Sequence, residues 1–301
     1  MIEKLLGIGK PLVLAPMGFL SGGALAAAVS SAGGLGLIGA GYGDARWIDE
    51  QFRLARAARV GVGFITWSLA RKPELLDQAL AHRPCAVMLS FGDPAPFADK
   101  VRAAGAKLIL QVQDLETARE ALRARPDVIV AQGTEAGGHG GGRSLFALLP
   151  AVKAIAGDVP VLAAGGIADA SGMKAARALG AGGVLVGTRF VAADEALATR
   201  EAKQRVVQAN GDGTLRTTVF DIVRGYDWPA RFPARALRNS FSAQWHGREA
   251  ELRAKLAAEV KRYEAAVAAR DYDVALVFAG EAVDLIDEVL PAAKLVERIC
   301  G

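Results

Sequence analysis

The stretch VLAAGGIADASGMKAARALGAGGVLVGTRF, residues 161–190, decides the fold. It contains two short apolar runs, 161–163 and 183–186, and glycine follows soon after each of them. Between them lies an alanine-rich amphipathic segment, 169–179, with Asp169 at the N-cap position of a helix. Apolar runs without polar alternation are typical of strands that are covered on both faces. The stretch therefore predicts two buried parallel strands joined by a helix.

The same pattern recurs along the preceding chain. Further apolar runs, which we interpret as strands, lie at residues 12–15, 35–38, 60–65, 86–89, 107–112 and 128–131. Alanine-rich amphipathic stretches separate several of them. A doubly wound open sheet also buries such strands, but about eight strand–helix units favour closure. We predict an α/β protein with a parallel (β/α)8 barrel of the TIM type.

The regular alternation of strands and helices ends near residue 195. We predict that residues 1–195 form the barrel and that residues 196–274 form a small α-helical appendage, inserted late in the chain, with a long charged helix at 248–270. Residues 275–301 are expected to return to the barrel. Aromatic, proline and arginine residues gather at 216–241, a composition that suits either a lid or a subunit interface.

Composition excludes several classes of protein. The 301 residues are 52% hydrophobic and 23% charged, which excludes a disordered chain. The net charge of +4 is spread along the sequence without an aromatic and basic face, so we expect no nucleic-acid partner.

Location is predicted from cysteines and from apolar segments. Cys85 and Cys300 are too few for a disulfide framework and fit a reducing cytoplasm. The stretch 11–43 carries no charge, but Pro16 and many glycines interrupt it. These residues would break a helix that faces lipid. The amino-terminal residues lack a secretory signal pattern. We therefore expect a cytoplasmic protein without a membrane partner.

Two glycine-rich strand ends indicate a phosphate site. Gly165-Gly166 follows the run at 161–163, and Gly187-Thr188 follows the run at 183–186. Bare backbone amides approach a phosphate closely, and TIM barrels commonly bind phosphate at these two strand ends. Tight strand-to-helix turns are the simpler alternative. Neither a dinucleotide-binding fingerprint nor a P-loop is present.

A histidine among glycines is the most informative candidate for catalysis. His139 lies in AQGTEAGGHGGG, residues 131–142, directly after a predicted strand. An imidazole there can act as a general base or donate to an anionic substrate. His82 and His246 lie away from the predicted barrel mouth. No residues have the spacing of a metal site, so an organic cofactor must supply any redox chemistry.

These motifs together resemble the nitronate monooxygenase family. The resemblance rests on Ala15-Pro16-Met17, on residues 132–139, on residues 164–167 and on Gly187-Thr188-Arg189-Phe190. It implies a TIM barrel that binds FMN and oxidises alkyl nitronates, or nitroalkanes, with molecular oxygen. It also implies an anionic small-molecule substrate and no requirement for a nicotinamide. A homodimer is an assembly that the sequence leaves open.

The resemblance assigns expected roles by position. His139 matches the catalytic histidine, which removes a proton from neutral nitroalkanes or positions an anionic nitronate. The residues expected to bind the flavin ring and the phosphate are Ala15, Pro16, Met17, Gln111, Gly138, Gly165, Gly166, Gly187 and Thr188. Trp67 departs from the family, because an asparagine is expected near the third strand end. Glu281 and Asp284 add negative charge where relatives often have neutral residues.

Three alternatives remain open. An FMN-dependent enoyl-(acyl carrier protein) reductase has a similar Gly-Gly-His element but consumes NAD(P)H. A barrel that binds a phosphorylated ligand without turnover does not require His139. A sugar-phosphate isomerase needs a carboxylate base, for which Glu135 is the candidate in the histidine loop.

Overall fold

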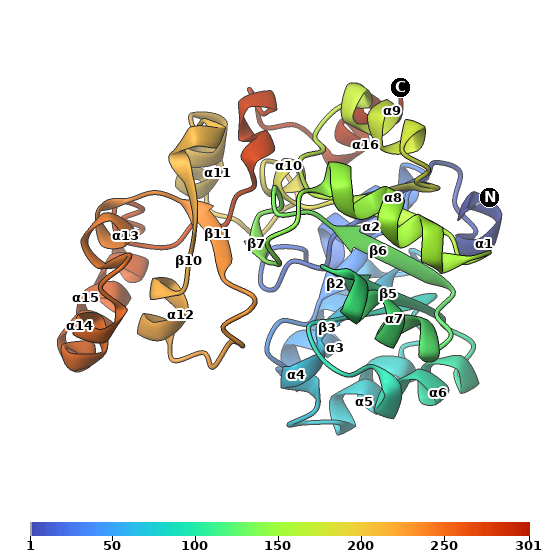
Figure 1. The fold of residues 1–301 in the computed structure, drawn as a ribbon, viewed down its shortest axis with the longest axis horizontal. Helices are drawn as coiled ribbons and strands as arrows, with labels where there is room; N and C mark the ends of the chain where they lie inside the picture. The colour runs from blue at the N-terminus through green and yellow to red at the C-terminus, as the bar shows by residue number, and fades with distance from the viewer. Residues whose placement is uncertain (1) are drawn as a thin grey trace.

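Eight parallel strands form the barrel of the computed structural model, which describes residues 2–301 (Figure 1). They are β1 (Leu12–Leu14), β2 (Leu37–Gly39), β3 (Gly61–Ile65), β4 (Ala86–Ser90), β5 (Lys107–Val112), β6 (Val128–Gln132), β8 (Val161–Ala164) and β9 (Gly183–Val186). Their order is β1-β9-β8-β6-β5-β4-β3-β2. A parallel bridge between Val13 and Leu35 joins the two edges and closes the ring. The predicted barrel and its strands are confirmed.

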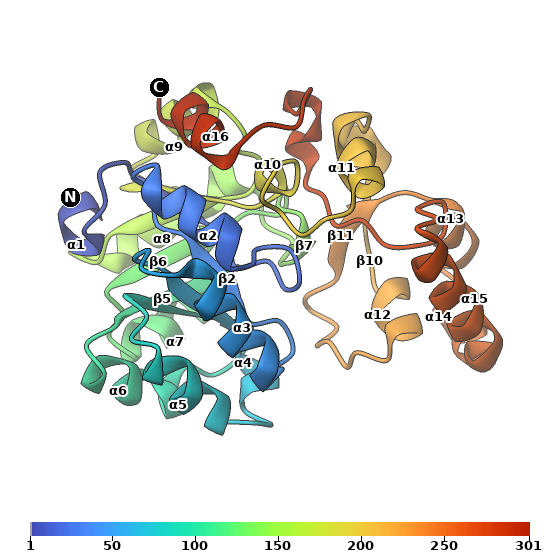
Figure 2. The same ribbon diagram turned by 180° about the vertical axis from the view of Figure 1, so that it is seen from behind.

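Helices cover the outside of the barrel (Figure 2). They are α2 (Gly23–Ser31), α3 (Ala45–Ala55), α4 (Thr66–Leu69), α5 (Glu74–Ala81), α6 (Ala95–Ala103), α7 (Leu115–Arg123), α8 (Leu145–Ala156), α9 (Ala170–Ala178) and α10 (Thr188–Val191). Aspartates fix the start of three of them, and Asp44 accepts from the amide of Trp47 at the start of α3. Asp114 accepts from the amide of Thr117 in a capping box, and Asp169 accepts from the amide of Gly172.

The barrel interior is apolar and is closed at its amino-terminal end. Side chains that point inward include Val13, Met88, Ile109 and Leu162, and all of them are buried. Helix α1 (Ile2–Leu6) contributes two buried side chains to this same cluster. The carboxyl ends of the strands are therefore the end at which a ligand enters.

The appendage differs from the prediction in two respects. It contains α11 (Arg200–Val207), η1 (Gly211–Gly213), β10 (Thr214–Thr217), α12 (Val219–Arg224), β11 (Ala234–Leu237), α13 (Ser240–Trp245), α14 (Glu249–Ala254) and α15 (Leu256–Ala269). It is not purely helical, because β10 and β11 form an antiparallel sheet with β7 (Gly138–His139). The helix predicted at 248–270 is two helices that turn at Lys255 around Trp245, whose indole donates to Glu259.

The chain end returns to the barrel. After η2 (Glu281–Leu285), helix α16 (Ala292–Cys300) packs against α2 and α9 (Figure 2). The boundaries at residues 195 and 274 stay a prediction. None of the helices within residues 2–301 has the length and the apolar composition needed to cross a bilayer.

Candidate active site

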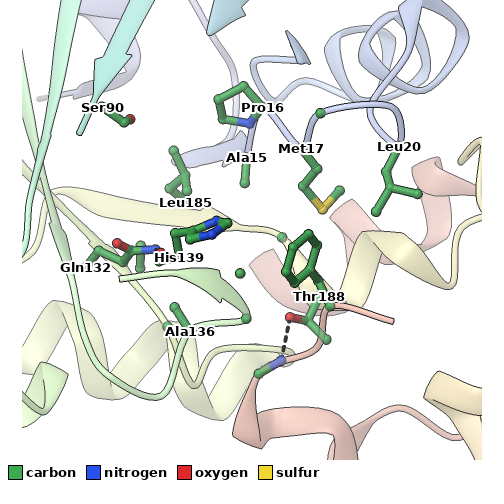
Figure 3. Close-up of a pocket in the computed structure, with 18 of the residues that line it drawn as sticks. Ala15, Pro16, Met17, Leu20, Ser90, Gln132, Ala136, His139, Leu185 and Thr188 are labelled. Atoms are coloured by element: carbon green, nitrogen blue, oxygen red, sulfur yellow. Dashed lines mark hydrogen bonds between the residues drawn. The ribbon is translucent and has the colours of Figure 1, made fainter. Parts of the chain in front are cut away.

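One cavity opens at the carboxyl ends of the barrel strands (Figure 3). Its lining includes every residue that the sequence predicted for the site: Ala15, Pro16, Met17, Gln111, Gly138, His139, Gly165, Gly166, Gly187 and Thr188. The close-up shows His139 in the middle, with Ala15 and Pro16 on one side and Thr188 on another. The fold thus brings together residues that are widely separated in the sequence. No group of three metal-binding side chains lies close together in residues 2–301.

His139 is buried and is held by a carboxylate. Its Nε2 lies 3.0 Å from each carboxylate oxygen of Asp221, and only 7% of the His139 side chain and 5% of the Asp221 side chain are exposed. An ionised carboxylate only accepts hydrogen bonds, so Nε2 carries the proton and Nδ1 of the neutral ring is left as an acceptor. Burial lowers the pKa of His139, although the hydrogen bond to Asp221 opposes that effect.

The backbone of His139 is fixed from two sides. β7 pairs with β11, so that His139 lies opposite Ala234 of the appendage. From the barrel, the side-chain amide of Gln132 donates to the carbonyl of His139 at 3.0 Å. The Gln132 oxygen in turn accepts from Gln111 at 3.1 Å and from Gln113 at 3.0 Å. Gln111 therefore lies at the cavity wall as part of a glutamine network that supports the histidine.

An aromatic cover from the appendage lies over the imidazole. The Trp228 ring stacks on His139 with a centroid distance of 3.4 Å and an interplanar angle of 6°. Its indole N–H donates to the Tyr42 hydroxyl at 2.9 Å, and Tyr42 stacks on Tyr226 at 3.6 Å. Burial raises the pKa of Tyr42 to about 12, so this hydroxyl stays neutral. Part of the segment 216–241 thus closes over the site of its own chain.

We name Gly165, Gly166, Gly187 and Thr188 the glycine cradle. Gly165 and Gly166 have φ values of +101° and +70°, which favour glycine, and a Cβ on Gly165 lies 3.0 Å from the amide nitrogen of Ala136. Within residues 2–301, the backbone amides of Gly166 and of its neighbour Ile167 have no hydrogen-bond acceptor. The Thr188 hydroxyl accepts from the amide of Gly280 at 3.0 Å and still has a proton to donate.

The turn after β1 packs closely against β3 at the barrel mouth. A Cβ on Gly63 lies only 2.2 Å from the Pro16 side chain, so glycine is required for β3 to accommodate that ring. The Met17 amide donates to the Ser21 hydroxyl at 2.7 Å, which fixes the turn after Pro16. Ala15, Pro16 and Met17 therefore lie on a rigid turn at the cavity wall.

The acidic candidates already have partners. Both oxygens of Glu135 accept from the Leu145 amide, at 2.9 and 3.0 Å, so this carboxylate caps α8. Glu281 pairs with Arg235 at 2.8 Å, and Asp284 accepts from the Gly211 amide at 3.1 Å. The carboxylate base required by an isomerase is thus bound to a helix terminus.

Sequence reasoning missed Asp221, Gln132 and Trp228 as parts of the site. Asp221 lies 82 residues beyond His139 and outside the predicted barrel, so no local spacing links them. Trp228 lies in the segment 216–241, whose composition suits a lid or a subunit interface, but its position over the imidazole follows only from the fold. Gln132 directly follows the strand predicted at 128–131 and lies within the quoted histidine motif, so its position at a strand end was a usable signal.

Comparisons with known proteins agree with this geometry. The family model described as nitronate monooxygenase matches residues 1–79 and 60–301. Nitronate monooxygenase npaC of Metarhizium robertsii is 37% identical over 80% of this chain and 75% of its own length.

Two solved structures have the same fold. FabK from Thermotoga maritima has a TM-score of 0.86 and 32% identity, covering 99% of this chain and 94% of its own. Nitroalkane oxidase from Streptomyces ansochromogenes has a TM-score of 0.80 and 29% identity, covering 99% and 96%.

These findings confirm the predicted resemblance and the predicted class of enzyme, an oxidoreductase that acts on a small molecule. They confirm the predicted cofactor at the level of a flavin, because the family is one of flavoproteins. The chain belongs to the nitronate monooxygenase family.

Proposed function

We propose that this enzyme oxidises alkyl nitronates with molecular oxygen and uses FMN as its flavin. The observation that carries the proposal is the buried pair of His139 and Asp221 in the cavity that also contains the glycine cradle. A barrel that only binds a phosphorylated ligand requires no oriented, buried imidazole. The geometry therefore favours turnover over storage.

The residues present fit FMN. Its phosphate requires several donors in a space without side chains. The amides of Gly166 and of its neighbour Ile167, which lack an acceptor, and the Thr188 hydroxyl are such donors. The flavin ring would be held by Ala15, Pro16, Met17, Gln111 and Gly138, which line the same cavity. When bound, FMN supplies the electron transfer that the side chains of this chain lack.

His139 is proposed to handle the substrate proton. Its lowered pKa keeps the ring neutral near pH 7, and Nδ1 is then free to accept the proton on the carbon next to a nitro group. Asp221 holds Nε2–H and stabilises the imidazolium that this transfer forms. An alkyl nitronate has already lost that proton, and for it the imidazolium form of His139, with Asp221 as counterion, is proposed to donate a hydrogen bond from Nδ1.

Oxygen uptake tests the proposal. The FMN-loaded protein is mixed with ethylnitronate in the absence of NADH and NADPH, and rapid uptake is expected. The variant His139→Ala is expected to keep FMN but to lose most turnover of neutral nitroethane. No uptake by the flavin-loaded wild type contradicts nitronate oxidation, and undiminished nitroethane turnover by the variant removes His139 from the mechanism.

The second candidate is an enoyl-(acyl carrier protein) reductase fed by NAD(P)H, and the likeness to FabK favours it. Consumption of NADH with an enoyl substrate, without any response to ethylnitronate, would establish this alternative. The homodimer stays a prediction, which analytical ultracentrifugation of the purified protein tests.

A further inference from the structure

Arg224 is a cation without a partner at the wall of the site cavity. It is the last residue of α12 and lines the same cavity as His139. Its Nη1 is buried and has no hydrogen-bond partner, and no carboxylate in the described part of the chain forms an ion pair with it. A buried charged donor without an acceptor is costly, so this position indicates a missing acceptor.

Aromatic rings hold the Arg224 guanidinium in place. Its central carbon lies 4.6 Å from the ring centroid of Tyr226 and 5.9 Å from that of Phe278. The Phe278 centroid is also 5.7 Å from that of His139, so the cation and the imidazole both contact this one ring. Aromatic faces stabilise a cation but do not accept the in-plane N–H groups, which remain available to a ligand.

Other arginines near the cavity are committed to the protein. Arg216 donates to the carbonyls of Thr134 and Pro233, at 2.8 and 2.7 Å. Arg235 pairs with Glu281. Arg189 also has a buried Nη2 without a partner, but it is next to Thr188 of the glycine cradle and its Nη1 donates to the carbonyl of Glu288 at 3.1 Å.

Resting on the proposed function, we propose that Arg224 binds the anionic group of the substrate and thereby determines specificity. The fork of N–H donors matches planar anions with two oxygens, which are carboxylates and nitronates. Asp221 and Arg224 lie one turn apart on α12, so the same helix orients the imidazole and provides the cation. A neutral nitroalkane acquires the charge that this subsite binds only when His139 has removed its proton.

The test measures anion binding separately from turnover. Benzoate is titrated into the FMN-loaded protein and followed by the visible flavin spectrum, and KM is measured for ethylnitronate. The variant Arg224→Gln is expected to weaken benzoate binding, to raise the KM for ethylnitronate, or to do both. The expected change is about tenfold to a hundredfold, which is what the loss of a charge-assisted hydrogen bond causes. Arg224→Lys keeps the charge and is expected to restore part of the affinity. Arg231→Gln is the matched control, because Arg231 is exposed, lies in the same segment and does not line the cavity.

Each outcome has one meaning. A changed KM for ethylnitronate assigns Arg224 to the nitronate group, whereas a change confined to benzoate assigns it to a carboxylate elsewhere on the substrate. Values within about twofold of wild type for both ligands overturn the proposal. A loss of FMN affinity with unchanged benzoate binding also overturns it, because Arg224 would then serve the cofactor. If wild type binds benzoate through Arg224 but does not oxidise nitronates, the anion subsite stands and the proposed reaction fails.

Discussion

Replacing Asp221 with asparagine tests how the imidazole of His139 is controlled. Asparagine has almost the same shape as aspartate but no charge, and its amide both donates and accepts. In the structure both carboxylate oxygens lie 3.0 Å from Nε2, and neither side chain is exposed by more than 7%. Solvent therefore screens this pair very little, and the loss of charge acts on His139 almost in full.

The expected magnitude follows from the change in hydrogen bond. A bond to a charged group contributes about 1 to 1.5 kcal/mol more than a neutral one, which corresponds to about one pKa unit. The carboxylate raises the pKa of His139, so its removal lowers that pKa further. The acid limb of the pH profile for nitroethane is expected to move to lower pH by about one unit. The plateau rate is expected to fall about tenfold, because the imidazolium loses its counterion.

Histidine NMR reads the tautomer directly. The chain contains only three histidines, so 15N-labelled His139 is assigned by comparison with His139→Ala. We expect the Nε2–H tautomer in the wild type and a mixture in Asp221→Asn. A wild-type Nδ1–H tautomer, or an acid limb that moves to higher pH in the variant, refutes the assigned role of Asp221.

Two further predictions concern the cover and the cradle. Trp228→Ala admits water to His139 and removes part of the burial that lowers the pKa of this histidine. The acid limb of the pH profile for nitroethane is therefore expected to move to higher pH, opposite to the shift in Asp221→Asn. An unmoved limb contradicts this prediction. Gly165→Ala places a Cβ 3.0 Å from the Ala136 amide at a φ of +101° and is expected to weaken FMN binding about tenfold in a fluorescence titration. Gly180→Ala, at a φ of +96° outside the cavity, controls for general strain, and equal FMN affinity in both variants counts against the cradle.

The barrel was predictable because each of its units is local. Uninterrupted apolar runs specify buried parallel strands, and an aspartate such as Asp114 or Asp169 marks a helix start within a few residues. The glycine cradle was predictable for the same reason, since strand ends in a parallel barrel meet at one face. The prediction of a barrel did not depend on the strand register or on the closing bridge between Val13 and Leu35.

The appendage was less predictable because its structure depends on distant partners. β10 has the sequence TLRT, which contains no apolar run that predicts a strand. It pairs with β11, which in turn pairs with β7 of the histidine loop. Lys255 interrupts a segment whose composition suits one continuous helix, because both halves pack around Trp245. Asp221 acquires its role only when this sheet and α12 are assembled beside the barrel.

The pairing of β7 with β11 has a consequence for the order of synthesis. His139 emerges from the ribosome 82 residues before Asp221, and its backbone partner Ala234 follows later still. A nascent chain that ends after β9 has its barrel strands and its glycine cradle but no carboxylate to orient the imidazole. Under the proposed role of His139, reactivity toward substrate therefore begins only when the second part of the chain has been translated and has docked.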